Sequence, residues 1–224
     1  PSPLECTSCH GMPPAAPHPQ VAKCSICHQS AGGDTGQAIS NRNQHVDGKI
    51  ELKEGDCATC HGSKANAAPP PDTHGNTATH LPSVGAHQIH IKGTSRSRAV
   101  RCDECHMVPN ELRSALHLNG IADVVFSGVA TEFGMQPTYA QQTCSNSYCH
   151  DTSHFLGPDS GVKVPSPVWT RVDGTQAFCG ACHGLPPPLP HPFRYDCGSC
   201  HRTANTNGDI IAPNLHVNGE LDFR

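Results

Sequence analysis

The chain has 224 residues, of which 35% are hydrophobic, 4% aromatic and 15% charged, and its formal charge is -4. Without the 14 cysteines the hydrophobic share falls to about 29%, well below the roughly 45 to 50% of an ordinary globular domain. The composition therefore excludes a conventional large hydrophobic core, while the small net charge argues against a disordered polymer. A group other than protein must complete the interior.

Two classes of partner are also not expected. The sequence contains no run of about 18 apolar residues, so it predicts no membrane span. The 15 Lys and Arg residues are scattered, and Arg96, Arg98 and Arg101 form the one loose basic group. Because nucleic-acid binding requires a concentrated basic surface, we expect no nucleic-acid partner.

The cysteines form seven pairs, and a histidine follows each pair directly. Six pairs are CxxCH motifs and one is a stretched CxxxxCH motif, CSNSYCH. Two thiols at this spacing can form thioethers to the vinyl groups of one porphyrin, and the next histidine then reaches the iron. The sequence therefore predicts seven covalently attached c-type haems. In chain order the motif residues are Cys6, Cys9 and His10; Cys24, Cys27 and His28; Cys57, Cys60 and His61; Cys102, Cys105 and His106; Cys144, Cys149 and His150; Cys179, Cys182 and His183; and Cys197, Cys200 and His201.

Disulfides and zinc sites would also use paired cysteines. A disulfide framework does not explain the histidine after every pair. A zinc site needs two further ligands, for which a histidine beside the second cysteine is poorly placed. Haem also accounts for the composition, since one porphyrin for about 32 residues would replace the missing apolar side chains.

The two ends of the chain repeat each other. The segment CTSCHGMPPAAPHPQVAKCSICH, from Cys6 to His28, matches CGACHGLPPPLPHPFRYDCGSCH, from Cys179 to His201, without gaps. His18 and His191 occupy the same place in the two copies, so we expect both to be distal haem ligands. We predict one continuous heptahaem unit over 1–224, in which an N-terminal repeat (5–52) and a C-terminal repeat (178–223) flank a central segment (53–177).

Three segments place a histidine two residues before an Asp-Gly or Asn-Gly turn: NQHVDGKIEL, LHLNGIADVVF and NLHVNGELDF. This pattern predicts small β-hairpins with type I′ turns. Each hairpin would present one imidazole at a fixed position. The histidines concerned are His45, His117 and His216.

In the central segment, VGAHQIHI places His87 and His90 three residues apart, which puts both on one face of a helical turn. Side by side they cannot enclose one iron, so we expect them to serve two neighbouring haems. Short helical turns are also expected near the CxxCH motifs and at 111–116. Pro-rich and Gly-rich connections are expected at 67–85 and 156–168.

These choices give seven distal ligands for seven irons: His18, His45, His87, His90, His117, His191 and His216. His74, His80 and His154 are left over, and we expect them to be exposed, although each could replace one of the seven or reach a haem of another subunit. Met12, Met107 and Met135 are the alternative axial ligands. Surplus histidine makes a methionine ligand unnecessary.

The set of CSNSYCH, PVWT, CGACHGLPP and CGSCH, with VGAHQIHI before CDECHMVP, resembles the CxxxxCH/CxxCH multihaem cytochromes of dissimilatory metal-reducing bacteria. The resemblance implies an exported protein, at the outer cell surface or outside the cell, with the periplasm as second choice. It implies c-type haems with mostly bis-histidine ligation, and some members of the family polymerise into filaments. By position it assigns Cys144, Cys149 and His150 to one haem, and His87 and His90 to ligation.

The expected fold is a mostly irregular, haem-wrapped chain with short helical turns and small β-hairpins. With two histidines on every iron no position is left for a substrate, so electron transfer is favoured over catalysis. The partners would be other redox proteins or extracellular electron acceptors, and the repeated ends favour self-association into filaments. A discrete periplasmic carrier and a reductase with one open iron are the alternatives.

Overall fold

The structure is a computed structural model that describes residues 7–15, 18, 20–21, 23–32, 38–114, 117–157 and 159–224, without the side chains of His154 and Phe155. It divides into two compact units. Unit 1 comprises Pro1–Thr77 and Pro109–Ala122, and unit 2 comprises Ala78–Val108 and Asp123–Arg224. Each unit therefore contains one of the terminal repeats. The single heptahaem unit over 1–224 stays a prediction.

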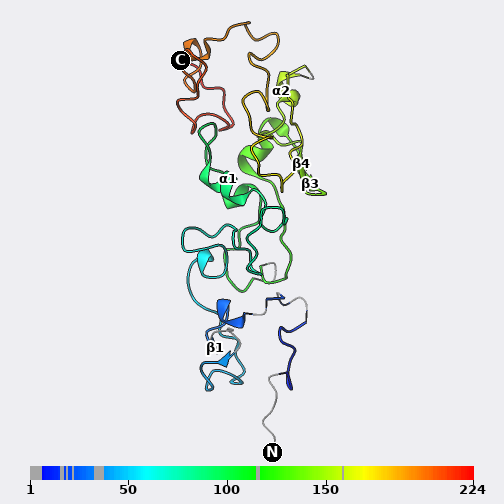
Figure 1. The fold of residues 1–224 in the computed structure, drawn as a ribbon, viewed down its shortest axis with the longest axis vertical. Coiled ribbons are helices and arrows are strands. Elements are labelled where there is room, and N and C mark those ends of the chain that lie inside the picture. The colour runs from blue at the N-terminus through cyan, green and yellow to red at the C-terminus, as the bar shows by residue number, and fades with distance from the viewer. Residues whose placement is uncertain are drawn as a thin grey trace, which may run out of the picture. The chain divides into compact units, whose positions relative to one another are not determined.

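Regular secondary structure is sparse, which confirms the predicted fold class (Figure 1). Two short antiparallel sheets pair β1 (Ala31–Gly32) with β2 (Ala38–Ile39), and β3 (Thr138–Ala140) with β4 (Thr143–Ser145). The helices of the described residues are α1 (His87–Lys92) and α2 (Ser153–Leu156), and the 3-10 helices η1 (Cys24–Ile26), η2 (Cys57–Thr59), η3 (Cys102–Glu104), η4 (Gly128–Gly134) and η5 (Cys197–Ser199). No described helix has the length and apolar content that crossing a bilayer requires.

Four of the CxxCH motifs form the same local structure. A 3-10 helix begins at the first cysteine, and the histidine N–H donates to the carbonyl oxygen of that cysteine at 2.8 to 3.0 Å. This turn brings the first cysteine, the second cysteine and the histidine, at positions i, i+3 and i+4, to one side of the backbone. Local sequence alone thus builds the predicted helical turns and groups the three chemically active side chains.

The stretched motif folds differently because its two cysteines lie in different elements. Cys144 lies in β4 opposite Tyr139 of β3. The other half of the motif is a turn in which the His150 N–H donates to the Ser147 carbonyl at 3.1 Å. The two additional residues therefore allow one cysteine to remain in a strand while the other adjoins its histidine.

The prediction of β-hairpins around His45, His117 and His216 was wrong. A type I′ turn needs positive φ at two successive residues, whereas here the positive φ values are at Val46 (74°) and Gly48 (82°), with Asp47 between them. The C-terminal copy repeats this with Val217 (63°) and Gly219 (95°). In the described residues, these segments form turns without paired strands.

The residues that follow each turn pair with a CxxCH motif instead of folding back on the residues before the turn. This explains why the hairpins do not form, since the motif takes the backbone bonds that the second strand would have used. Three isolated bridges make these contacts: His28 with Leu52, His106 with Val124, and His201 with Phe223. Of the short helical turn expected at 111–116, residues 111–114 form a turn in which the Ser114 N–H donates to the Glu111 carbonyl at 3.2 Å, and 115–116 lie outside the described residues.

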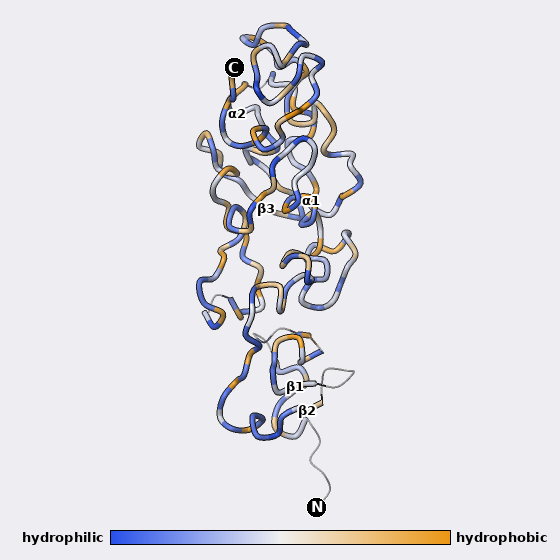
Figure 2. The backbone as a smooth tube through the Cα atoms, turned by 90° about the vertical axis from the view of Figure 1, so that its left-hand side faces the viewer, coloured by the Kyte–Doolittle hydropathy of each residue, from blue (hydrophilic) through white to orange (hydrophobic). Residues whose placement is uncertain are grey.

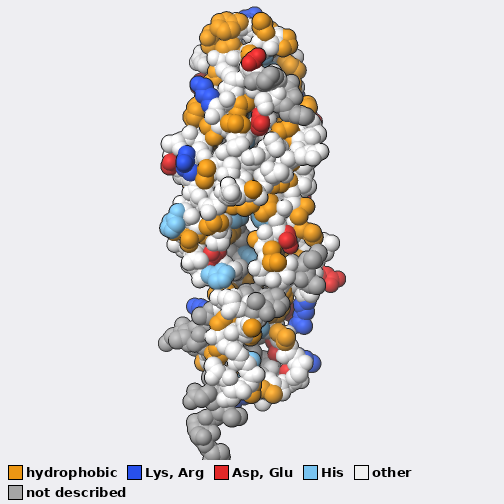
Figure 3. Space-filling model, turned by 90° about the vertical axis from the view of Figure 1, so that its right-hand side faces the viewer, with side chains coloured by type: hydrophobic (Ala, Val, Ile, Leu, Met, Phe, Trp, Pro, Cys, Tyr) orange, Lys and Arg blue, Asp and Glu red, His pale blue; other side chains and the backbone are white. Residues whose placement is uncertain are grey.

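Protein side chains supply only a thin core. Among the residues that the structure describes, the buried hydrophobic ones are Ala68, Val84, Ala130, Met135, Tyr148, Ala181 and Ala204, four of which are alanines. Hydrophobic and hydrophilic residues are interspersed along the backbone (Figure 2). Apolar side chains are scattered over the surface, where some histidines also emerge (Figure 3). The described chain thus leaves much of its apolar surface without protein cover, as expected when a cofactor completes the interior.

Candidate functional site

Each of the seven motif histidines faces a second histidine. The ring centroids of the two imidazoles are 5.9 to 6.3 Å apart in every pair. A metal ion bound to one nitrogen of each ring at about 2 Å would hold the centroids about 6 Å apart. The spacing therefore fits one iron between the two rings. The pairs are His10–His45, His28–His18, His61–His117, His106–His87, His150–His90, His183–His216 and His201–His191.

The fourteen histidines in these pairs are the fourteen that the sequence predicts as ligands. The structure adds which distal histidine faces which motif histidine, a question that the sequence left open. Every pair lies within one unit, with three pairs in unit 1 and four in unit 2. Each unit thus holds complete pairs of its own.

Backbone carbonyl groups orient many of these rings. A carbonyl oxygen can only accept, so the ring nitrogen Nδ1 that meets it must carry the proton. The tautomer is then fixed, and the other nitrogen, Nε2, keeps its lone pair for a metal. The Nδ1 contacts are His10 with Gly11 (2.8 Å), His87 with Val84 (2.7 Å), His90 with Ala86 (2.9 Å), His106 with Asp123 (2.8 Å), His117 with Leu112 (2.9 Å), His183 with Gly184 (2.8 Å), His191 with Pro192 (2.7 Å) and His216 with Arg96.

The pairs fall into two classes by the angle between their ring planes. Four are closer to parallel, at 5°, 8°, 21° and 27°. Three are closer to perpendicular, at 67°, 71° and 80°. Because the relative orientation of two axial imidazoles influences the electronic state of the iron between them, the chain would impose two kinds of environment on its metal centres.

Burial favours the neutral, metal-binding form of several rings. It lowers the pKa of His150 to about 4, and the nearby His90 adds to this effect. Burial also lowers the pKa of His90, and the same cause lowers the pKa of His61. A histidine with a lowered pKa stays unprotonated at neutral pH, which is the state that a metal requires.

The thirteen cysteines that the structure describes form no disulfide with one another, and Cys6 lies outside the described residues. Burial raises the pKa of the Cys149 thiol to about 12 and that of Cys105 to about 11. In the described chain, no group of three or more His, Cys, Asp or Glu side chains is arranged to hold a metal ion. The histidines therefore meet two at a time, as suits an iron whose other four ligands come from a porphyrin.

Neighbouring motifs touch one another. In unit 1 the Cys60 Sγ lies 3.9 Å from the carbonyl oxygen of Ile26, which is inside the preceding CxxCH motif. In unit 2 the Thr152 hydroxyl, just after the stretched motif, donates to the Cys182 carbonyl. These contacts place successive attachment sites beside each other along the chain.

Helix α1 confirms the helical turn predicted for His87 and His90. The two residues face different motif histidines, His106 and His150. One helical turn thus supplies ligands to two separate sites, and the spacing between those sites is tied to the rise of the helix.

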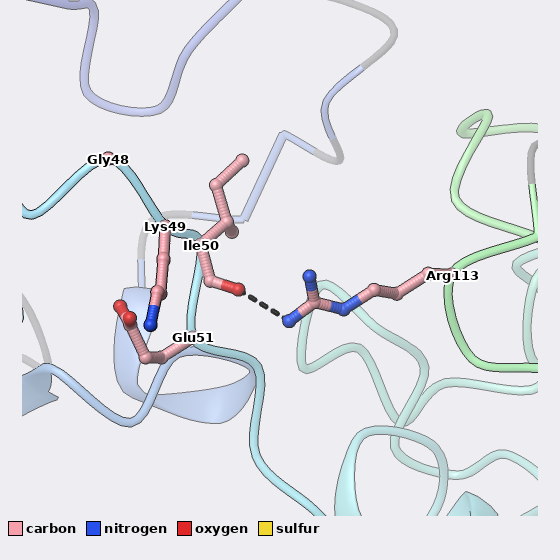
Figure 4. A pocket seen from close by; sticks show the side chains of 5 residues that line it. All are labelled: Gly48, Lys49, Ile50, Glu51 and Arg113. Atoms are coloured by element: carbon pink, nitrogen blue, oxygen red, sulfur yellow. Dashed lines mark hydrogen bonds between the residues drawn. The ribbon is translucent and has the colours of Figure 1, made fainter.

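A hollow of about 470 Å³ opens in unit 1 between the segments that carry His45 and His117 (Figure 4). Its lining includes Lys49, Glu51 and Arg113, and the Arg113 guanidinium donates to the Ile50 carbonyl at 2.7 Å. Two cations against one anion make this hollow suitable for carboxylate groups such as haem propionates.

The remaining candidates are placed as follows. His74 and His80 are exposed, and the His154 side chain lies outside the described residues. Each motif histidine faces a histidine and not a methionine. Trp169 contacts both His87 and His90, but the sequence predicts no role for it: it is the single tryptophan of the chain and lies in PVWT, one of the segments that carry the family resemblance.

Residues 143–183 match a family model described as the Geobacter CxxxxCH...CXXCH motif. The match covers the stretched motif with Cys144, Cys149 and His150 and the following CxxCH motif with His183. No curated protein and no solved structure matches the chain. The match covers 41 of the 224 residues, and together with the paired cysteines and their histidines it supports a multihaem c-type cytochrome, a class of protein that binds haem covalently and transfers electrons.

Proposed function

We propose that this protein is a heptahaem c-type cytochrome that relays electrons through closely spaced bis-histidine haems to acceptors outside the cell. The observation that carries the proposal is that all seven motif histidines face a second histidine at the spacing of a shared metal ion. Each haem, when bound, supplies a one-electron couple at its iron.

The chain's own residues attach, orient and enclose the cofactor. Each pair of cysteines would anchor one edge of the porphyrin, while the motif histidine would take one side of the iron. The distal histidine would take the other side, and the Nδ1–H bonds to carbonyl groups described above hold the rings that make them in a binding orientation. If both histidines of each pair bind one iron, a substrate would have no access to the metal, so a carrier is favoured over a reductase.

Contacts between successive motifs support a relay. The contact of Cys60 with Ile26 joins the second and third motifs, and helix α1 serves the fourth and fifth. The Thr152 hydrogen bond to Cys182 joins the fifth and sixth. A chain that packs its attachment sites against one another brings the redox centres close, as electron hopping needs.

The proposal extends to export and to association of copies into filaments. Its support is the resemblance to cytochromes of metal-reducing bacteria, together with the equivalent histidine pairs in the two terminal repeats. If copies associate, the first and last pairs along the sequence would offer similar redox centres to the neighbouring molecules. Other redox proteins or extracellular acceptors would then receive the electrons.

The test uses native, untagged holo-protein. Intact mass should show seven haems, the ferrous protein should bind almost no CO, and electron microscopy of the same sample should show regular filaments. Fewer haems, or one haem that binds CO, would contradict the relay of closed irons. Dispersed particles of monomer size would contradict association and identify a discrete carrier.

A further inference from the structure

Trp169 lies against two of the proposed distal ligands at once. Its ring centroid is 4.8 Å from that of His87, with the planes at 88°, and 5.5 Å from that of His90, with the planes at 33°. Both histidines belong to helix α1, and they face the histidines of two different motifs. One indole therefore contacts side chains of two neighbouring histidine pairs.

The backbone of Trp169 is tied to the strand that carries a haem attachment site. Its N–H donates to the Gln142 carbonyl at 2.7 Å, and the preceding residue, Val168, bridges to Thr143 of β4. The Gln176 side chain accepts from the Val168 N–H at 2.8 Å and donates to its carbonyl at 2.9 Å. Since Cys144 lies in β4, the tryptophan and the stretched motif form one local structure.

The indole ring is held independently of its backbone. The Nε1–H donates to the Pro82 carbonyl at 2.8 Å. Gly85 lies beneath the ring, where a Cβ would be 1.9 Å from Nε1, so only glycine leaves room for the indole. A side chain fixed at both ends can act as a rigid wall for whatever packs against it.

The imidazoles of His87 and His90 need a rigid neighbour to fix the orientation of their ring planes. Each has one hydrogen bond, from Nδ1 to the carbonyl of Val84 or Ala86, and this bond leaves the ring free to tilt. The indole blocks the edge of one ring and lies beside the other. In the resulting pairs, the planes of His87 and His106 are 21° apart and those of His90 and His150 are 71° apart.

We propose that Trp169 is a positioning residue that sets the ring planes of His87 and His90 and thereby makes two adjacent haems electronically different. The inference rests on the proposed function, because the planes matter only if both histidines bind iron. It extends that function by naming the residue through which the chain tunes two successive steps of the relay.

The test is electron paramagnetic resonance of the fully oxidised protein. The wild type should show two classes of low-spin signal in a ratio of four to three, because near-parallel and near-perpendicular imidazoles give different g values. Trp169→Ala should shift one signal of each class and leave the other five. Trp169→Phe, which keeps an aromatic ring, should restore both signals in large part.

Gly85→Ala provides a second approach, since it displaces the indole without removing it and should shift the same two signals. Gly174→Ala is the matched control, because Gly174 also has positive φ (83°) but a Cβ there meets nothing within 4 Å. A Trp169→Ala spectrum identical to wild type, in protein that carries all its haems, would overturn the role of Trp169. A wild-type protein with fewer than seven haems would instead overturn the proposed function.

Discussion

The two terminal repeats hold the same arrangement of four histidines in different units of the molecule. In each copy one pair is almost parallel and comes from histidines about 10 residues apart, while the other joins the first motif to the segment after the second. The near-parallel pairs are His18–His28 (6.1 Å, 5°) and His191–His201 (6.1 Å, 8°), and the others are His10–His45 (6.3 Å, 67°) and His183–His216 (6.3 Å, 80°). The geometry of the pairs therefore depends on the repeated sequence and not on its surroundings.

The copies differ where the chain returns from the second motif to the distal histidine. In the first copy this connection contains β1 and β2. In the second it is two residues shorter and contains a loop in which Asn205 accepts from the N–H groups of Asn207 and Asp209 at 3.0 and 2.9 Å. Both connections bring the distal histidine, His45 or His216, to the same place in its pair. The conformation of the connecting loop therefore affects the geometry of the pair less than the positions of its two ends do.

A second difference lies beside the second motif. In the C-terminal copy, Arg202 forms a 2.6 Å ion pair with Asp222, whose side chain is only 4% exposed. Gln29 and Glu51 stand at these places in the first copy. The backbone bond between the two positions is kept in both copies, at 3.1 and 3.2 Å. The backbone hydrogen bond therefore forms with or without the ion pair, which only the C-terminal copy has.

The largest effect is expected when the distal histidine of a near-parallel pair is removed. Comparing His18–His28 with His191–His201 in this way tests whether the two pairs are equivalent. His18→Ala and His191→Ala should each open one axial position, so that one haem per molecule becomes able to bind CO. The ferrous CO difference spectrum measures this and should have equal amplitude in the two variants. CO binding in only one variant would break the equivalence of the repeats.

A smaller effect is expected at the glycine after the first motif of each copy. A Cβ at Gly11 or Gly184 would lie 2.9 Å from a proline carbonyl oxygen, and at Gly184 it would also be 3.4 Å from the Ser160 carbonyl. Replacement by alanine should lower the free energy of unfolding by about 1 to 3 kcal/mol, with Gly184→Ala the more costly. Thermal unfolding measures this, and the reverse order would contradict the part assigned to Ser160.

The smallest effect concerns the ion pair. Arg202→Gln leaves the buried Asp222 carboxylate without its cation and should cost about 1 kcal/mol, which is limited because the Arg202 side chain is 58% exposed. The converse change, Gln29→Arg, should alter stability less. Chemical denaturation of both variants gives the comparison, and equal losses would show that the ion pair does not distinguish the copies.

Much of the candidate site follows from local sequence. Motif spacing and repeats select the fourteen histidines, whose role as ligands stays a prediction, and the i, i+3 spacing predicts helix α1 around His87 and His90. The pairing does not follow, because His90 and His150 are brought together by segments far apart in the chain. A sequence records which residues can bind but not which distant segments meet.

The prediction of β-hairpins was wrong for a related reason. An Asp-Gly or Asn-Gly signal predicts that the chain turns, but it does not identify the backbone that the next residues will pair with. The CxxCH motifs provide that backbone, as the bridge between His28 and Leu52 shows. Trp169 was missed because its effect depends on Gly85 and on helix α1, which are distant from it in sequence.

The separation of paired histidines along the chain suggests an order of folding after haem attachment. His18 and His28 close a loop of about 10 residues, as do His191 and His201, whereas His90 and His150 close one of about 60. The longer closure costs about 1.6 kcal/mol more in chain entropy. The shortest loops should therefore form first, at both ends of the chain, and the link between α1 and the stretched motif should form last.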